Sequence, residues 1–295
     1  MMAQAPGKTT LTGWLFKGPA LTLLAFFMVY PILSSLWMSL QVGKGMNFSF
    51  GGFANMWRLT QDAVFQQALL NTLTLLVVQV PIMITLAMLM AVALNDPSLK
   101  GRALFRTAIF LPCVTSLVAY SVLFKSMFAF DGVVNRFLEA LHIMDQPIPW
   151  LSDAFWAKTL IILAITWRWT GYNTIFFLAS LQNIDPSIYE AARIDGIPRW
   201  AQFIKITLPA LKPVILFTTV TSTIGTLQLF DEVNTITPLG GPSNSTLTLS
   251  LYIYQLSFKF MPSFGYAATV SYVIVVLVMI LSFIQFVVAR ERRRP

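Results

Sequence analysis

The stretch Leu69–Leu94, LLNTLTLLVVQVPIMITLAMLMAVAL, contains no charged residue. The hydrocarbon core of a bilayer is roughly 30 Å thick, and a helix of about 20 mostly apolar residues crosses it. The composition agrees with such a segment, because 56% of the residues are hydrophobic and 11% are charged, whereas soluble domains average about 25% charged residues. The chain is therefore predicted to be a membrane protein.

Five further apolar stretches, each bounded by charged residues or by Gly, Pro, Asn and Ser, repeat this pattern along the chain. The six predicted spans are Gly18–Leu40, Leu69–Leu94, Leu104–Met127, Ala157–Leu181, Pro213–Phe230 and Tyr266–Ala289. The predicted fold is thus an all-α membrane protein with six transmembrane helices. We expect a cytoplasmic N-terminal segment at residues 1–17, a six-helix domain at residues 18–289 and a basic cytoplasmic tail at residues 290–295.

The positive charges predict the orientation of these spans, because Lys and Arg resist translocation across the membrane. Of the 20 Lys and Arg residues, thirteen fall on the same side as both termini, six fall on the opposite side, and Arg168 lies within the fourth span. Both termini are therefore expected in the cytoplasm. The net charge of +8 is then explained by membrane insertion, and a nucleic-acid partner is not expected.

The sequence gives little support for catalytic chemistry. A single cysteine, Cys113, and a single histidine, His142, exclude an internal disulfide and any site that needs several histidines. The chain has no H-E-x-x-H, no G-x-S-x-G and no phosphate-binding G-x-x-x-x-G-K-[ST] motif. We therefore expect no enzyme, no metal site and no cofactor bound by this chain itself.

The segment between the fourth and fifth spans, Asn183–Pro209, reads NIDPSIYEAARIDGIPRWAQFIKITLP and is expected on the cytoplasmic side. Its pattern predicts two short helices around a sharp turn. The first helix begins either with Asp185 as the N-cap before Pro186, or with a capping box formed by Ser187 and Glu190.

Gly196 is placed to adopt a left-handed conformation after the first helix. Pro198 can open the second helix, and Pro209 and Pro213 would end it. The apolar face of that helix would consist of Trp200, Phe203, Ile204 and Leu208. A compact, partly apolar segment of this kind suits docking to another protein. An amphipathic loop lying on lipid headgroups has the same pattern and is the alternative.

This segment resembles the EAA loop of permease subunits in binding-protein-dependent ABC importers. The residues that match the family's motif and spacing are Glu190-Ala191-Ala192, Asp195-Gly196, Phe203, Ile206, Leu208-Pro209 and Pro213. The resemblance covers about residues 68–288, with the coupling loop at residues 183–212. Other stretches are similar to the carbohydrate branch of this family, which includes permeases for maltose, lactose and glycerol phosphate: Phe105-Arg106, Leu111-Pro112, Trp167, Gln228–Asp231, Thr237–Pro242 and Gly265–Ala268.

The resemblance implies a type I ABC importer permease fold and one half of a translocation pathway. The implied partners are a second permease that completes a heterodimer, an ATPase dimer that binds ATP and Mg, and an extracytoplasmic solute-binding protein. The implied location is the cytoplasmic membrane of a bacterium or archaeon. The expected cargo is a disaccharide or short oligosaccharide, with glycerol phosphate or another polyol, or an amino acid, metal or peptide, as alternatives. A stand-alone secondary transporter is less favoured, because the loop motif is present.

The resemblance also implies a role for the loop as the contact with the ATPase. Ala191 and Ala192 would permit close approach, Glu190 and Asp195 would pair with basic residues of the ATPase, and Gly196 would set the angle between the helices. The expected coupling residues are Glu190, Ala191, Ala192, Asp195, Gly196, Phe203, Leu208 and Pro209.

Polar residues inside the spans are the candidates for the substrate pathway. A buried arginine costs roughly 2.5–3.5 kcal/mol in a span unless it finds a partner, so Arg168 either helps to bind the sugar or pairs with Asp231 or Glu232. Hydroxyls in the fifth span can equally serve helix packing alone. The expected pathway residues, which combine aromatic faces with hydrogen-bonding groups, are Arg168, Trp169, Tyr172, Asn173, Ser222, Thr226 and Gln228.

Overall fold

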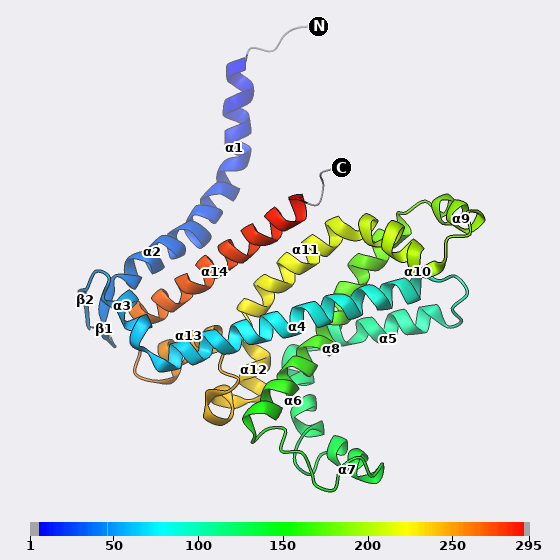
Figure 1. Cartoon of the computed structure of the whole chain (residues 1–295). Coiled ribbons are helices and arrows are strands. Elements are labelled where there is room, and N and C mark those ends of the chain that lie inside the picture. Colours follow the sequence, from blue (N-terminus) through cyan, green and yellow to red (C-terminus); the bar gives the residue numbers. More distant parts are fainter. Residues whose placement is uncertain (1–5, 46, 292–295) are drawn as a thin grey trace. The chain divides into compact units, whose positions relative to one another are not determined.

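The computed structural model describes residues 6–45 and 47–291 and consists mainly of helices (Figure 1). In chain order the elements are α1 (Pro6–Leu24), α2 (Tyr30–Ser39), β1 (Gln41–Lys44), β2 (Asn47–Phe50), α3 (Ala54–Gln61), α4 (Ala63–Asn95), α5 (Arg102–Val114), α6 (Leu117–Met127), α7 (Val133–Ala140), α8 (Ala154–Gln182), α9 (Pro186–Ile194), α10 (Arg199–Gln202), α11 (Leu208–Leu227), α12 (Asp231–Ile236), α13 (Leu249–Tyr254) and α14 (Phe264–Glu291). Short π-helical turns occupy Ala25–Val29, Phe203–Thr207 and Gln255–Lys259, and 3-10 turns occupy Pro238–Gly240 and Pro242–Asn244. Residues 1–5 of the predicted N-terminal segment and 292–295 of the predicted basic tail lie outside the described residues.

The chain divides into two compact units, and each is described by itself. The first unit comprises the described residues up to Gln61 together with Ile253–Tyr272. The second unit comprises Asp62–Tyr252 and the described residues from Val273 onward.

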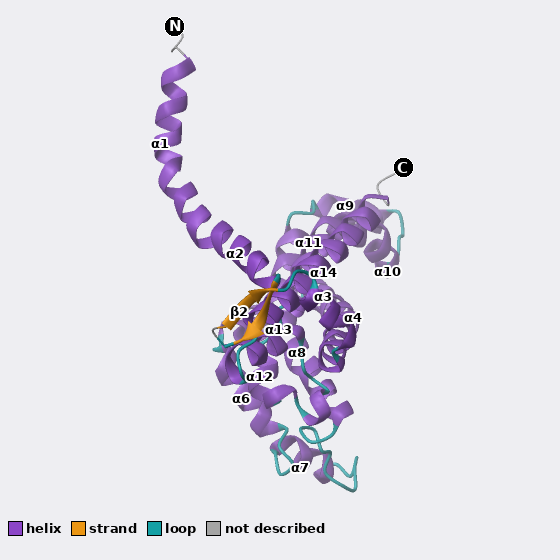
Figure 2. Ribbon diagram, turned by 90° about the vertical axis from the view of Figure 1, so that its left-hand side faces the viewer, coloured by secondary structure: helices purple, strands orange, loops and turns teal. Residues whose placement is uncertain are grey.

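The first unit contains a small antiparallel hairpin of β1 and β2 (Figure 2), which the all-α prediction did not include. Gly43 adopts a φ of +144°, and a Cβ there would overlap the carbonyl oxygen of Asn47, so the close strand approach requires glycine. The buried side chain of Asn55 donates from Nδ2 to the carbonyl oxygens of Ser39 at 2.9 Å and Gln41 at 2.7 Å. These hydrogen bonds connect α3 to the end of α2 and to the start of β1.

The second unit is built around the long helices α4 and α8, with α11 packed on α4 and α5 packed on α8. Their contact surface is apolar and includes the buried residues Met83 and Ala87 of α4, Phe177 of α8 and Leu211 of α11. Small side chains such as Ala87 and Ala91 let helix backbones approach closely, as is usual between membrane helices. This packing fixes the relative positions of the helices that carry the candidate site.

Four of the described helical stretches are long and apolar enough to cross a membrane: Gly13–Ser39, Ala63–Asn95, Arg199–Leu227 and Phe264–Ala289. They correspond to the predicted first, second, fifth and sixth spans. Helices α5 and α6 make a fifth if they count together as one bent span. Helix α8, the predicted fourth span, has 29 residues but is not among the described helices that are both long and apolar enough to cross a membrane. Two of its polar residues, Arg168 and Asn173, are buried inside the unit.

The prediction of a single helix over Leu104–Met127 is wrong. This stretch is divided into α5 and α6, which are bent by 100° at Thr115 and Ser116. Ser and Thr side chains compete with helical hydrogen bonds, and the Thr115 hydroxyl donates to the carbonyl oxygen of Pro112 at 2.7 Å. The break removes the helical donors from the last carbonyls of α5, and the neighbouring helix α8 supplies a replacement, as described below.

The predicted end of the second helix in the coupling loop is also wrong, because the helix begins after Pro198 as expected but neither Pro209 nor Pro213 ends it. Helix α10, the following π turn and α11 form one helical stretch, Arg199–Leu227. In a regular α-helix the ring of Pro209 would clash with the carbonyl of Lys205. In the wider π turn, the N–H of Leu208 donates to the carbonyl oxygen of Phe203, and this change of register just before the proline lets the helix continue.

A buried asparagine organises the connection between α6 and α8. Asn135 is 2% exposed and donates from Nδ2 to the carbonyl oxygens of Phe130 and Ile148, both at 3.0 Å. Its Oδ1 accepts hydrogen bonds from the N–H of Ile148 at 3.2 Å and from Nε1 of Trp150 at 2.9 Å. One side chain therefore holds α7 against the chain that returns to α8.

Replacing Asn135 with alanine is expected to unfold this connection locally, because each buried group left without a partner costs roughly 1–3 kcal/mol. Limited proteolysis of the purified variant should cut within residues 129–153 faster than in the wild type. The matched control is Asn183→Ala, since Asn183 is exposed and donates to the carbonyl oxygen of Ala179 within its own helix turn. Equal cleavage of the two variants would contradict the role assigned to Asn135.

Candidate functional site

A cavity of about 390 Å³ lies inside the second unit, and α4, α8, α11 and α12 provide most of its walls. Small-molecule sites usually have volumes of roughly 300–1,000 Å³, so this cavity is large enough to hold a small ligand. Its lining combines apolar side chains such as Met83 and Ile165 with aromatic, hydroxyl, amide and carboxylate groups.

Six of the seven predicted pathway residues line this cavity. They are Trp169, Tyr172 and Asn173 of α8, Ser222 and Thr226 of α11, and Gln228 just after α11. The three α8 residues are spaced so that they share one face of the helix. The structure therefore brings these side chains together, and their contact with a substrate stays a prediction.

The aromatic part of the lining is formed by Trp169 and Tyr172. Their rings meet edge to face with centroids 5.6 Å apart, and Tyr172 is 41% exposed. Aromatic rings present an apolar face, and the phenol and indole also carry a polar group. This pair can pack against the CH face of a small polar ligand and hydrogen-bond to its edge.

Hydrogen bonds between helices position the buried polar groups of the cavity. The Thr226 hydroxyl donates to Oε1 of Gln79 at 3.2 Å, which joins α11 to α4. Nδ2 of Asn173 donates to the carbonyl oxygen of Trp169 at 3.0 Å and lies 3.6 Å from the sulfur of Met83. Gln79 was not among the predicted residues, although an amide inside an otherwise apolar span is the signal that could have identified it.

Arg168 lies outside the cavity lining, contrary to the prediction. Its Nη1 donates to the carbonyl oxygen of Pro112 at 3.0 Å, and its Nη2 lies 3.5 Å from that of Cys113. Its guanidinium also lies over the ring of Tyr120, 4.6 Å from the centroid. Arg168 hydrogen-bonds to neither Asp231 nor Glu232 and instead supplies donors to the carbonyls that the break after α5 exposes.

Glu232 forms part of the cavity wall instead of pairing with Arg168 through a hydrogen bond. The carboxylate is 3% exposed, and Nε1 of Trp169 donates to its Oε1 at 3.4 Å. Asp231 is exposed and lines the cavity beside it. The sequence by itself does not place either carboxylate in the cavity, because their position relative to α8 depends on how the helices pack.

The coupling loop begins with α9, and the structure selects Asp185 as its N-cap. The side chain of Asp185 accepts a hydrogen bond from the N–H of Ser187 at 2.9 Å, and Pro186 occupies the first turn. This backbone hydrogen bond lowers the pKa of Asp185 below its usual value. Of the two starts that the sequence allowed, the Asp185 cap is the one observed.

The end of α9 is a Schellman motif centred on Gly196. Gly196 has a φ of +72°, as predicted, and its N–H donates to the carbonyl oxygen of Arg193 at 3.1 Å. The N–H of Ile197 donates to the carbonyl oxygen of Ala192 at 2.9 Å, which completes the motif. Two contacts then hold the turn against the next helix. The hydroxyls of Tyr189 and Thr207 lie 2.9 Å apart, and Nε2 of Gln202 donates to the carbonyl oxygen of Ile197 at 2.7 Å.

The predicted coupling residues divide between the inside and the outside of this loop. Glu190, Ala191, Asp195, Gly196 and Pro209 are exposed, and Phe203 and Leu208 are half-buried. Ala192 is 4% exposed, so it packs within the loop itself, which corrects the expectation that both alanines face a partner.

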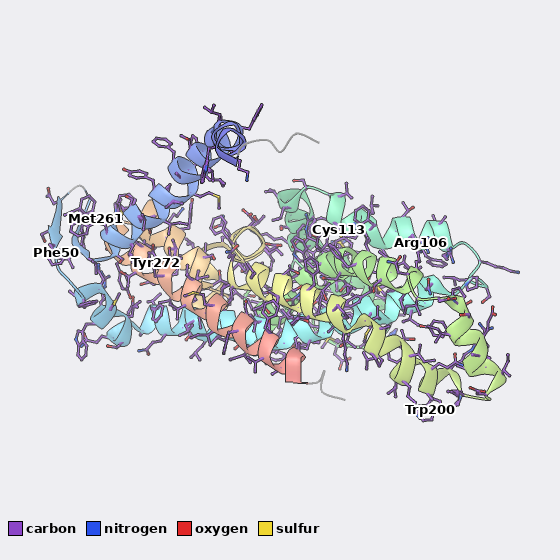
Figure 3. The ribbon with its side chains drawn as sticks, turned by 90° about the horizontal axis from the view of Figure 1, so that it is seen from above. Phe50, Arg106, Cys113, Trp200, Met261 and Tyr272 are labelled. Atoms are coloured by element: carbon purple, nitrogen blue, oxygen red, sulfur yellow. The ribbon has the colours of Figure 1, made fainter. Side chains whose placement is uncertain are left out.

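Two large apolar side chains of this loop are unusually open. Ile194 is 86% exposed and Trp200 is 68% exposed, and Trp200 is labelled in Figure 3. Both lie next to the turn at Gly196, one on either side of it in the sequence. Exposed apolar side chains of this kind are available to a protein partner or to lipid headgroups.

A family model described as "Binding-protein-dependent transport system inner membrane component" matches residues 68–294. The lactose transport system permease protein LacF of Rhizobium radiobacter is 66% identical over 284 residues, which cover 96% of this chain and 95% of the relative. The arabinooligosaccharides transport system permease protein AraP of Halalkalibacterium halodurans is 35% identical over 258 residues, which cover 87% of this chain and 80% of the relative.

A solved structure has the same fold. It comes from a bacterial ABC transporter involved in the import of the acidic polysaccharide alginate, and it aligns with a TM-score of 0.84 at 24% sequence identity. The alignment covers 97% of this chain and 99% of the other. The family indicated by the EAA-like loop is therefore confirmed, and the chain belongs to the binding-protein-dependent transport system inner membrane components.

Proposed function

We propose that this chain is one of two permease subunits of an ATP-driven ABC importer and forms half of a sugar pathway across the cytoplasmic membrane. One observation carries this proposal: the two helices that supply most of the polar cavity lining, α8 and α11, are also the helices joined by the coupling loop. Movement of the loop is thereby transmitted to the walls of the cavity.

The coupling loop would transmit this movement through a rigid turn. The Schellman motif at Gly196 and the Tyr189–Thr207 contact fix α9 relative to the start of the helical stretch that becomes α11. Ile194 and Trp200 provide exposed apolar surface for an ATPase subunit, and Glu190 and Asp195 provide charge for pairing with its basic residues. When the ATPase dimer closes around ATP and Mg, the loop would turn as one piece and displace α8 against α11.

Six membrane spans fit these helices if α5 and α6 count as one broken span and α8 as a buried one. Irregular backbone at membrane depth is tolerated where protein covers it and satisfies its polar groups, as Arg168 does for the carbonyl of Pro112. The distribution of Lys and Arg supports both termini, and the loop, on the cytoplasmic side.

The proposed cargo is a disaccharide or short oligosaccharide. The paired rings of Trp169 and Tyr172 beside hydroxyl and amide groups suit a ligand with apolar CH faces and many hydroxyls. The relatives named above belong to lactose and arabinooligosaccharide transport systems, which supports the same class. A solute-binding protein would deliver the sugar to this pathway.

This proposal is tested by purifying the tagged chain in mild detergent and identifying the proteins retained with it by mass spectrometry. We expect a second multi-span permease and an ATP-binding subunit to copurify with it. A tagged membrane protein of unrelated function, extracted in the same way, controls for adventitious retention. A chain that persists alone or as a homodimer under gentle extraction would contradict the importer assignment and favour a secondary transporter.

A further inference from the structure

We propose that Asp231 and Glu232 form an anion-excluding wall of the cavity, so that this subunit passes neutral saccharides and rejects acidic ones of the same size. The inference rests on the proposed function, because it names the class of sugar that the same cavity accepts. It argues against sugar acids, phosphorylated sugars and glycerol phosphate as cargo.

The charged side chains of the cavity lining are both acidic. Among the described residues that line it, Asp231 and Glu232 are present and Lys, Arg and His are not. The remaining polar lining is uncharged and consists of the phenol of Tyr172 and the indole of Trp169 together with Gln79, Asn173, Thr221, Ser222, Thr226 and Gln228. Sugar hydroxyls can donate to carboxylates and exchange hydrogen bonds with amides and hydroxyls. A neutral saccharide is therefore compatible with every polar group of the lining.

An acidic saccharide would meet the carboxylates at short range. Glu232 is held beside the aromatic part of the lining, because Nε1 of Trp169 donates to its Oε1 at 3.4 Å. A sugar ring that packs on Trp169 therefore lies next to this carboxylate, and Asp231 is the adjacent lining residue. Burial raises the pKa of Glu232, which is only 3% exposed, so the exposed Asp231 carries the larger part of the Coulomb repulsion toward an anionic ligand.

The neighbouring cation interacts electrostatically with Glu232 but is not part of the lining that a ligand meets. Arg168 lies 5.7 Å from the ring centroid of Trp169, but its guanidinium is directed to the carbonyl oxygens of Pro112 and Cys113. An anionic ligand inside the cavity would thus face the two carboxylates without reaching this guanidinium.

The fold by itself does not set the charge preference. The chain with the same fold described above comes from a transporter involved in the import of an acidic polysaccharide. Since a permease of this architecture can serve in the import of an acidic saccharide, the fold does not by itself exclude one. In this chain the charged side chains of the lining are Asp231 and Glu232.

The inference is tested by measuring how lactose and lactobionate, an anionic sugar of similar size, bind to the purified complex. This complex contains the chain with its partner permease and ATPase. Isothermal titration of the complex without its binding protein removes the selectivity of that protein. We expect the wild-type complex to bind lactobionate about tenfold or more weakly than lactose, as one repulsive charge pair at a partly buried site predicts. The double variant Asp231→Asn, Glu232→Gln should reduce this ratio to near one.

The substitutions keep the shape of both side chains, and the glutamine that replaces Glu232 retains an oxygen that can accept the Trp169 hydrogen bond. Asp231→Asn alone, at the exposed position, should reduce the ratio in part. The matched control removes the same two charges elsewhere through Asp131→Asn and Glu139→Gln, which are exposed and outside the lining, and should leave the ratio unchanged.

Equal binding of both sugars by the wild type, or an unchanged ratio in the double variant, would overturn the charge filter while leaving the sugar permease assignment in place. Failure of the assembled wild-type complex to bind lactose or any neutral disaccharide would instead overturn the proposed cargo, and the filter with it.

Discussion

Replacing Gly171 with alanine is expected to destabilise the second unit by about 1–3 kcal/mol or more, the range for overpacked interiors. A Cβ at Gly171 would overlap the carbonyl oxygen of Ile109 in α5 and lie 3.4 Å from the sulfur of Cys113. The first of these atoms belongs to the backbone, so a side-chain rotation cannot relieve the overlap. The helices α5 and α8 would have to separate, and this would also pull Arg168 away from the carbonyls that it satisfies.

The matched control is Gly225→Ala, because a Cβ at Gly225 has no heavy atom within 4 Å. Gly225 lies inside α11, where alanine usually stabilises a helix by roughly 0.5–1 kcal/mol over glycine. Thermal unfolding of the two detergent-solubilised variants should therefore move in opposite directions from the wild type. Equal melting temperatures for both variants would show that α5 and α8 are not packed backbone to backbone at Gly171.

Replacing Gly196 with valine is expected to abolish sugar uptake while the protein still reaches the membrane. The φ of +72° at Gly196 is strained for residues with a Cβ and especially for β-branched ones. The valine variant should leave the left-handed conformation and lose the Schellman hydrogen bonds to Arg193 and Ala192. The angle between α9 and the following helix would then change, and the proposed contact with the ATPase would be misplaced.

The control for this variant is Gly196→Asn. Asparagine tolerates the left-handed conformation far better than valine, and a Cβ at this position meets nothing within 4 Å. The asparagine variant should therefore retain most of the transport. Uptake and ATPase activity, measured in vesicles with equal amounts of each variant, distinguish the outcomes. Normal uptake by the valine variant would mean that the conformation of this turn does not matter for coupling.

The two variants address different parts of one proposed path. Gly171 lies at the contact of α8 with α5, and Gly196 lies at the turn that leads from α8 to α11. The cavity residues Trp169 and Tyr172 occupy the same helix as Gly171. Loss of stability of the second unit is therefore expected from the first substitution, and loss of coupling, with the structural change confined to the loop, from the second.

Local sequence patterns were sufficient for the membrane class, the family and the conformation of the coupling loop turn. An uncharged stretch such as Leu69–Leu94 predicts a span, because burying charge in a bilayer is costly and the helix must satisfy its own backbone. The left-handed conformation of Gly196 follows from its place after a short helix. Each of these features depends on residues that are close together in the chain.

Tertiary structure decided the features that depend on distant residues. Arg168 donates to the carbonyl oxygen of Pro112, which is 56 positions away in the chain. This carbonyl lies at the break between α5 and α6, which the apolar character of the stretch alone did not reveal. Thr226 and Gln79 are 147 positions apart and meet in the cavity. Glu232 became part of a cavity wall, and not the hydrogen-bonding partner of Arg168, because helix packing placed Trp169 next to it. Sequence thus determined which side chains are polar inside the membrane, and packing determined which of them face the cavity, since that depends on helix rotation and contact.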